Sequence, residues 1–136
     1  MATIERFEQL ISWQEARSLN KIIGKLIDSG RFKNSYQLIN QVEGSAGSIM
    51  DNISEGFERS GNKEFMQFMY IAKGSCGELR SQLYRALDRG YITQNEFDSL
   101  SIHAMKISSL IQKLITYLGN STSKGAKYKP KNPQNP

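Results

Sequence analysis

Two stretches of the sequence decide the fold: Gln41–Gly56, QVEGSAGSIMDNISEG, and Gly74–Leu79, GSCGEL. Both lie inside long apolar patterns with helical spacing, yet both hold glycines where a stable helix favours alanine. Each glycine inside a helix costs about 0.5–1 kcal/mol relative to alanine. Such residues are retained where something large comes close to the backbone, and here another helix is the natural candidate. The two stretches therefore predict a tightly packed bundle of helices.

Working outward, four segments carry apolar residues with helical spacing. They run from about residue 13 to 28, from 35 to between 56 and 61, from 62 to 90, and from 93 to 119. The last has a seam that steps by three and four residues: Phe97, Leu100, Ala104, Ile107, Ile111, Leu114 and Leu118. This spacing is typical of left-handed packing at shallow crossing angles. No alternating run beside a hairpin turn competes as a strand.

Signals for helix ends separate the four segments. Ser12 with Glu15, and Thr93 with Glu96, have the spacing of capping boxes. Asn62 is expected to cap the third helix. Three glycines are expected to end helices: Gly30, Gly90 and Gly119. Because the connections are short, the sequence predicts an all-α, antiparallel up-down-up-down four-helix bundle over residues 1–119.

The charge of the chain is unevenly distributed. Residues 120–136 hold three prolines and four of the 18 basic residues, Lys124, Lys127, Lys129 and Lys131, with no acid. This composition predicts a disordered, flexible Lys/Pro/Asn tail. The remaining 14 basic and 13 acidic residues nearly balance, so the bundle itself is not expected to attract nucleic acid by net charge alone. No signal peptide or membrane-spanning run is recognisable, and a cytoplasmic protein is expected.

Several large apolar residues fall outside the four stripes. They are Ile39, Met50, Met66, Tyr70, Ile71, Ile102, Leu110, Ile115 and Tyr117. Scattered exposed apolar residues are normal, but wide apolar patches are rare on monomers. We favour a second buried face used for self-association. The small residues Gly44, Gly47, Ser48, Gly74, Ser75 and Gly77 fit either internal helix crossings or such a subunit contact.

Catalysis finds little support in the residue types present. The one cysteine, Cys76, has the setting of a small buried apolar residue. The one histidine, His103, lies on a helix without an obvious nucleophile beside it. No Glu-x-x-His pair suggests a di-metal site, and no glycine loop has the pattern of a phosphate-binding motif. No metal or cofactor is expected, and the sequence predicts a protein that is not an enzyme.

The motif Asn52–Gly56, NISEG, followed by Arg59, resembles a known family when taken with three further features. These are Phe65 and Phe68 at the start of the third helix, the GSCGEL segment, and Tyr91-Ile92 after that helix. Together they are similar to small bacterial four-helix-bundle proteins encoded by intervening sequences of 23S rRNA genes. The resemblance runs from about Trp13 to Leu118. Where the family usually has alanine, this chain has Ser54.

The resemblance implies a homo-oligomeric ring, typically a pentamer. It also implies distant kinship with the accessory variability determinant of diversity-generating retroelements, a bundle that binds a reverse transcriptase and nucleic acid. The family has no well-established activity, and RNA or DNA binding is the usual suggestion for it. The family often carries a basic pair where this chain has Glu43-Gly44. If that pair contacts phosphate in relatives, this protein has lost the contact.

Two sets of residues are candidates for the functional surfaces. The motif residues expected to fix helix register or subunit geometry are Asn52, Glu55, Gly56, Arg59, Gly74, Ser75 and Glu78. For Glu55 and Glu78 we expect a partly desolvated carboxylate with a basic partner: Arg59, four residues on, for Glu55, and Arg17 or Arg80 for Glu78. Candidates for phosphate contact are Lys21, Lys25, Arg31, Lys33, Arg80, Arg85, Arg89 and the tail lysines.

Two functions remain open at this stage. The leading hypothesis is a homo-oligomeric bundle that binds RNA or DNA, or a ribonucleoprotein, as an accessory factor. The alternative is a scaffold for protein–protein interaction without a nucleic-acid role, which the near-neutral bundle and Glu43 favour. The expected partners are a second copy of the chain, then RNA or DNA, then a reverse transcriptase or another protein, and no membrane.

Overall fold

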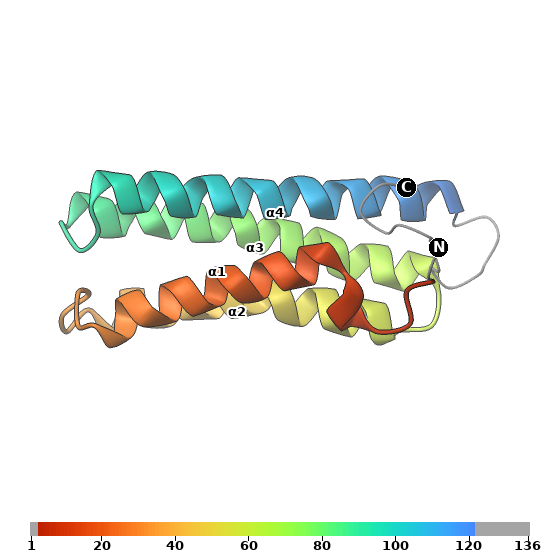
Figure 1. The fold of residues 1–136 in the computed structure, drawn as a ribbon, viewed down its shortest axis with the longest axis horizontal. Coiled ribbons are helices and arrows are strands. Elements are labelled where there is room, and N and C mark those ends of the chain that lie inside the picture. Colours follow the sequence, from red (N-terminus) through yellow and green to blue (C-terminus); the bar gives the residue numbers. More distant parts are fainter. Residues whose placement is uncertain (1–2, 122–136) are drawn as a thin grey trace.

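The computed structural model describes residues 3–121, so the predicted tail beyond Ser121, with its four lysines, lies outside the described residues. A single 3₁₀ turn, η1 (Phe7–Gln9), precedes four helices: α1 (Ile11–Asp28), α2 (Tyr36–Glu58), α3 (Asn62–Asp88) and α4 (Gln94–Ser121). The helices lie side by side along one long axis, and consecutive helices run in opposite directions (Figure 1). The prediction of an all-α antiparallel bundle is confirmed.

The apolar stripes of the four helices form one core. Every residue of the predicted α4 seam, from Phe97 to Leu118, is buried. Leu38, Val42, Ile49 and Ile53 of α2 belong to the same core and have no exposed surface above 1%. Spacings of three and four residues put these side chains on one face of each helix, which accounts for a single continuous core.

The predicted cap of α4 is confirmed. The backbone N–H of Glu96 donates to the Thr93 hydroxyl (3.1 Å), and the backbone N–H of Thr93 donates to the Glu96 carboxylate (2.8 Å). The two bonds satisfy amides that would otherwise lack a partner at the helix start. Gly30 and Gly90 also follow the ends of α1 and α3 as expected, with φ of 80° and 77°.

The predicted capping box of α1 is wrong. The helix begins two residues earlier, at Ile11, after a 3₁₀ turn that the sequence reading did not foresee. Leu10 is fully buried at this junction, and the Phe7 and Trp13 rings pack edge to face at 5.1 Å. Burial of these apolar groups therefore sets the start of α1. The Ser12 hydroxyl is buried and has no hydrogen-bond partner in the described part of the chain.

Two other predicted boundaries need correction. Asn62 is the first residue of α3 and is buried, whereas the capping position is held by Gly61 at φ 110°. That backbone conformation strongly favours glycine over any residue with a side chain. Gly119 does not end α4, which continues to Ser121. A Cβ atom at Gly119 would lie 3.7 Å from the Met66 sulfur, an ordinary contact.

Candidate functional site

The motif residues Asn52 and Ser75 join α2 to α3 through a third residue, Ser48. The Asn52 side-chain amide donates to the backbone carbonyl of Ser48 (2.8 Å) and to its hydroxyl (2.9 Å). The Ser75 hydroxyl donates to the Ser48 hydroxyl at 2.8 Å. Such short side chains let the two helix backbones lie close together while their polar groups remain paired. Sequence reasoning placed Ser48 among the small residues but did not identify it as the centre of this cluster.

Gly56 is the helix glycine that the packing requires most clearly. A Cβ atom there would lie 2.8 Å from Cβ of Phe68 and 3.0 Å from Cδ1 of Phe65. Carbon atoms normally approach to about 3.5–4.0 Å, so alanine does not fit unless α2 and α3 move apart. The motif glycine is therefore explained by close helix packing within one chain.

Glu55 and Arg59 form the ion pair expected from their spacing. The Arg59 guanidinium lies 2.7 Å from the Glu55 carboxylate and 3.7 Å from that of Glu64, and it covers the Phe68 ring at 5.0 Å. These contacts join the end of α2 to the start of α3. The Glu55 side chain is 53% exposed, so the expected partial desolvation of its carboxylate is modest. An exposed pair of this kind contributes little to stability.

Four further glycines of the two deciding stretches lie in open space. Within the part of the chain that the structure describes, a Cβ atom at Gly44, Gly47, Gly74 or Gly77 would meet nothing within 4 Å. Gly44, Gly74 and Gly77 are exposed, and Gly47 is half-buried. Glu78 is exposed nearby and has no ion pair or hydrogen bond among residues 3–121, so the expected partner, Arg17 or Arg80, is not found. Internal helix crossings therefore do not explain these four glycines, and the subunit-contact alternative remains.

The basic residues predicted to contact phosphate divide into two groups. Four have partners within the described residues. Arg31 pairs with Glu96, Arg85 donates to the Gln41 side chain (2.7 Å), and Arg89 lies 5.4 Å from the Tyr91 ring; the fourth, Arg80, has a weaker contact. The side chains of Lys21, Lys25 and Lys33 are exposed and have no ion pair or hydrogen bond within the described residues. Arg80 donates weakly to Ser101 at 3.4 Å.

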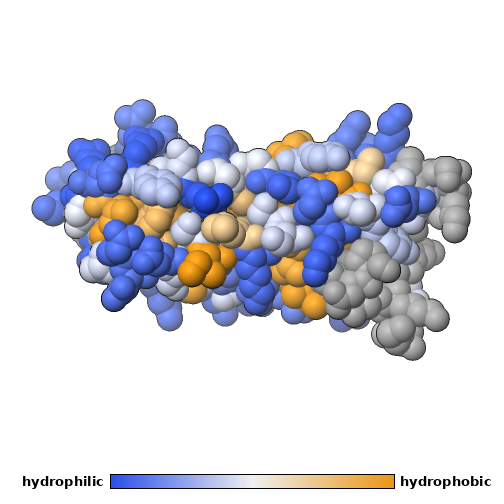
Figure 2. All heavy atoms as spheres, turned by 90° about the horizontal axis from the view of Figure 1, so that it is seen from above, coloured by the Kyte–Doolittle hydropathy of each residue, from blue (hydrophilic) through white to orange (hydrophobic). Residues whose placement is uncertain are grey.

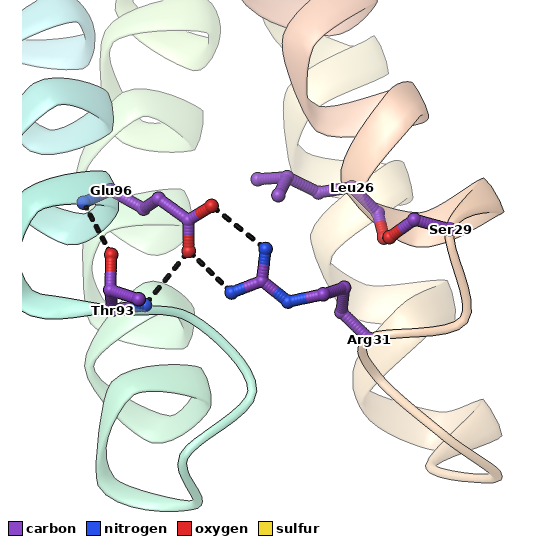
Figure 3. Close-up of polar contacts among 5 residues, drawn as sticks. All are labelled: Leu26, Ser29, Arg31, Thr93 and Glu96. Atoms are coloured by element: carbon purple, nitrogen blue, oxygen red, sulfur yellow. Dashed lines mark hydrogen bonds and ion pairs between the residues drawn. The ribbon is translucent and has the colours of Figure 1, made fainter.

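The Arg31–Glu96 pair ties the α1–α2 connection to the start of α4 (Figure 3). Two guanidinium nitrogens donate to the two carboxylate oxygens, at 2.8 and 2.6 Å. The Arg31 guanidinium, followed by the Thr93 amide, lowers the pKa of Glu96 from 4.5 to about 2. Beside the pair, the Ser29 hydroxyl donates to the Leu26 carbonyl (2.6 Å) at the end of α1. Because Arg31 and Glu96 are 65 residues apart, their spacing in the sequence does not predict the ion pair.

The surplus apolar residues are only partly at the surface. Tyr70, Ile71 and Ile102 are exposed as predicted, Ile102 to 67%. Ile115 is buried in the core, contrary to expectation. Five of the predicted residues are half-buried: Ile39, Met50, Met66, Leu110 and Tyr117. On the side that carries α4, apolar groups form separate islands among hydrophilic ones (Figure 2).

The charges of α1 and α2 are strongly asymmetric. Between Tyr36 and Glu58, α2 has no lysine or arginine, and its four acids are all exposed: Glu43, Asp51, Glu55 and Glu58. By contrast, α1 exposes Arg17, Lys21 and Lys25. The surface that could attract a polyanion is therefore on α1 and not on α2.

The one cysteine and the one histidine of the sequence, Cys76 and His103, are buried or engaged with neighbouring side chains. Burial raises the pKa of the Cys76 thiol to about 12, so the reactive thiolate is scarce near neutral pH. His103 Nε2 lies 2.8 Å from the Glu15 carboxylate, which Lys106 also approaches at 3.5 Å, and this cluster joins α1 to α4.

Within residues 3–121 no three His, Cys, Asp or Glu side chains are placed to hold a metal ion. No helix in this range has the length and apolar character needed to span a bilayer.

The chain thus has the fold of an antiparallel four-helix bundle whose second and third helices are joined by a motif of small and polar residues. Residues 8–113 match the 23S rRNA-intervening sequence protein family, and the chain belongs to that family. A solved structure of a protein of unknown function from Bacteroides thetaiotaomicron, assigned to the S23 ribosomal protein family, has the same fold. It is 20% identical, covers 76% of this chain and 97% of its own, and superimposes with a TM-score of 0.69. A search of curated proteins found no match.

Proposed function

We propose that this protein is a non-enzymatic building block that assembles with copies of itself, with a ring of five favoured. We propose further that the assembly binds RNA or DNA, or a ribonucleoprotein, as an accessory factor. The number five and the kinship with reverse-transcriptase accessory proteins come from the family resemblance. The buried Cys76 and the paired His103 support a role without catalysis.

The observation that carries the assembly proposal is the set of open glycines on α2 and α3. Gly44, Gly47, Gly74 and Gly77 each weaken a helix by about 0.5–1 kcal/mol, and no neighbouring atom among residues 3–121 accounts for them. A surface without side chains allows the backbone of another helix to approach closely. The exposed Tyr70 and Ile71, which adjoin this part of α3, supply apolar area that a partner would cover.

Nucleic acid as the partner is supported by one observation on the structure and by the family resemblance. The family is named for intervening sequences of 23S rRNA, which says where its genes lie, so the choice of RNA rests on the resemblance. The exposed lysines Lys21, Lys25 and Lys33 have no ion pair among the described residues and are available to neutralise phosphate. A reverse transcriptase is a further candidate partner that rests on the resemblance alone.

The assembly proposal is tested by the double variant Gly44→Ala/Gly77→Ala, compared with Gly24→Ala. Gly24 on α1 also has no neighbour within 4 Å, so each added methyl group fits the isolated chain. We expect all three substitutions to favour the helix, but only the double variant to lower the mass measured by sedimentation equilibrium. Equal masses for the wild type and both variants would show that the open glycines of α2 and α3 are not the subunit contact.

The nucleic-acid proposal is tested by a mobility-shift titration with structured RNA at two salt concentrations. Phosphate-driven binding weakens steeply with salt, with a logarithmic slope of about −0.7 to −0.9 per phosphate contact. We expect clear binding at about 50 mM salt and a large loss by about 200 mM. No shift at the lower concentration would remove this half of the proposal and leave the assembly half standing.

The acidic face of α2 favours a second candidate function, a scaffold for protein–protein interaction without a nucleic-acid role. Its four acids and the absence of basic residues over 23 residues suit a basic protein partner better than a nucleic acid. This candidate predicts that deleting residues 121–136 leaves recovery of the protein partner unchanged in a pull-down. It also predicts that reversing the charge of Glu43 and Asp51 abolishes that recovery.

A further inference from the structure

The outward ridge of α1 combines three positive charges with little opposing charge. Arg17, Lys21 and Lys25 follow one another at intervals of four residues, and all are exposed. This spacing places the charges about 6 Å apart along the helix axis. Of the two acids of α1, Glu15 is engaged with His103 and Lys106 of α4, and the exposed Asp28 lies beyond Lys25 at the C-terminal end of the helix. The ridge is therefore a line of positive charge along one side of the bundle.

A hollow of about 400 Å³ adjoins the N-terminal end of this ridge and opens to solvent. Its lining is aromatic, basic and polar: Glu8, Trp13, Gln14, Arg17, Ser18 and Lys21. The Trp13 ring is held from one side by Phe7 at 5.1 Å, and the Arg17 guanidinium lies 5.9 Å from its centre. A half-buried aromatic ring, fixed by packing and bordered by donors, is a platform on which a planar group can stack.

We propose that the α1 ridge and this hollow form a contact surface for single-stranded nucleic acid, an inference that rests on the nucleic-acid half of the proposed function. Phosphates of the strand lie along Arg17, Lys21 and Lys25, and one unstacked base enters the hollow against Trp13. Positively charged grooves combined with aromatic platforms are the usual means of binding single strands. A paired base is stacked inside its duplex and does not reach such a hollow.

The charges around the hollow fit a base as well as a phosphate. Glu8 at the rim is a hydrogen-bond acceptor for the exocyclic amino group of a base, as carboxylates are for cytosine. The exposed acids of α2 repel phosphate, so a strand that leaves the hollow follows α1 and does not cross to α2. The surface therefore gives both a place and a direction to the bound strand.

The test uses the full chain, whose one tryptophan, Trp13, reports directly on the hollow. Trp13 emission is followed during titration with a 12-nucleotide single-stranded RNA at low salt, and binding is measured in parallel by fluorescence anisotropy of a labelled copy. We expect emission to change as the anisotropy saturates. The variant Lys21→Gln/Lys25→Gln should lose roughly ten- to a hundredfold in affinity, because it removes two phosphate contacts.

Matched controls separate the ridge from general charge. Lys63→Gln/Lys113→Gln removes two exposed lysines from α3 and α4 and should bind within roughly threefold of the wild type, a loss that reflects net charge alone. Trp13→Phe keeps a stacking ring and should bind well, whereas Trp13→Leu should lose roughly five- to 150-fold. Circular dichroism melts confirm that each variant is folded before it is titrated.

Three outcomes overturn the proposal in distinguishable ways. Equal affinities for the two lysine pairs would show that the strand binds elsewhere, and the proposed function would still stand. Binding with unchanged Trp13 emission would show that no base enters the hollow. Absence of any binding by the wild type would remove both this surface and the nucleic-acid half of the proposed function.

Discussion

Replacing Gly56 with alanine should destabilise the bundle, although alanine is the better helix former. The new Cβ atom would lie 2.8 Å from Cβ of Phe68, which is close to the α3 backbone and cannot turn away. Met69 Cε, at 3.3 Å, belongs to a flexible side-chain end and can shift. The contact with Phe68 therefore decides the outcome, since relieving it requires α2 and α3 to separate locally.

The magnitude follows from two opposing effects. Overpacking of this kind costs about 1–3 kcal/mol, and the upper end applies because the nearest atom is a Cβ atom. Alanine recovers about 1 kcal/mol of helix propensity. We expect the free energy of unfolding to fall by about 2 kcal/mol. The control Gly24→Ala meets no neighbour within 4 Å and should instead gain about 0.5–1 kcal/mol.

Urea denaturation followed by circular dichroism at 222 nm measures both variants. The midpoint should shift without a large change in slope if only native-state packing is altered. Protein concentration must be equal in all samples, because assembly contributes to apparent stability. A Gly56→Ala protein as stable as Gly24→Ala would refute the close approach of α2 to α3 at this position.

Three further predictions concern other parts of the bundle. Because Arg31 lowers the pKa of Glu96, ionised Glu96 stabilises the fold above about pH 4.5, and this stabilisation is lost as the pH falls toward 2. The unfolding free energies of the wild type and of Glu96→Gln should therefore converge over that pH range, which acid titration of both proteins measures. Ser75→Ala removes the hydrogen bond to Ser48 and should cost about 0.5–1.5 kcal/mol in urea denaturation, a loss that would be absent if the cluster contributed nothing. Cys76 is buried, and the pKa of its thiol is raised to about 12. At pH 8 a thiol reagent should therefore modify it only as fast as the bundle unfolds locally. Rapid labelling of the native protein would contradict its burial.

The helices of this protein were predictable because their apolar spacing is regular. Each stripe residue of α4 is buried as its spacing requires, and the Thr93–Glu96 cap needs only local sequence. The cap at Ser12 was wrong because Leu10, just before it, is drawn into the core, and a local polar pattern does not reveal that burial.

The sequence held part of the signal that separates the roles of the glycines, and the packing supplies the rest. Gly56 follows Ile49 and Ile53 of the apolar stripe by seven and three residues, a spacing that already indicated an inward position. Gly44 and Gly47 lack that relation to the stripe and prove to be open. Sequence reasoning treated them alike because it considered their effect on helix stability and not their position relative to the apolar stripe.

The residues of the α1 surface were only partly foreseen. Lys21 and Lys25 were among the predicted phosphate contacts, but Arg17 was considered only as a partner for a carboxylate. The interval of four residues from Arg17 through Lys25 was a readable signal for a common face. The hollow beside Trp13 was not readable, because it depends on η1 folding back against α1.

The central claim is that copies of this chain contact one another at the open glycines of α2 and α3, which are Gly44, Gly47, Gly74 and Gly77. Sedimentation equilibrium of the full-length protein tests it most directly. The account predicts a mass several times the 15.4 kDa of one chain, with five copies favoured, over a wide range of protein concentration. A well-folded species of 15.4 kDa at the highest concentration would contradict it.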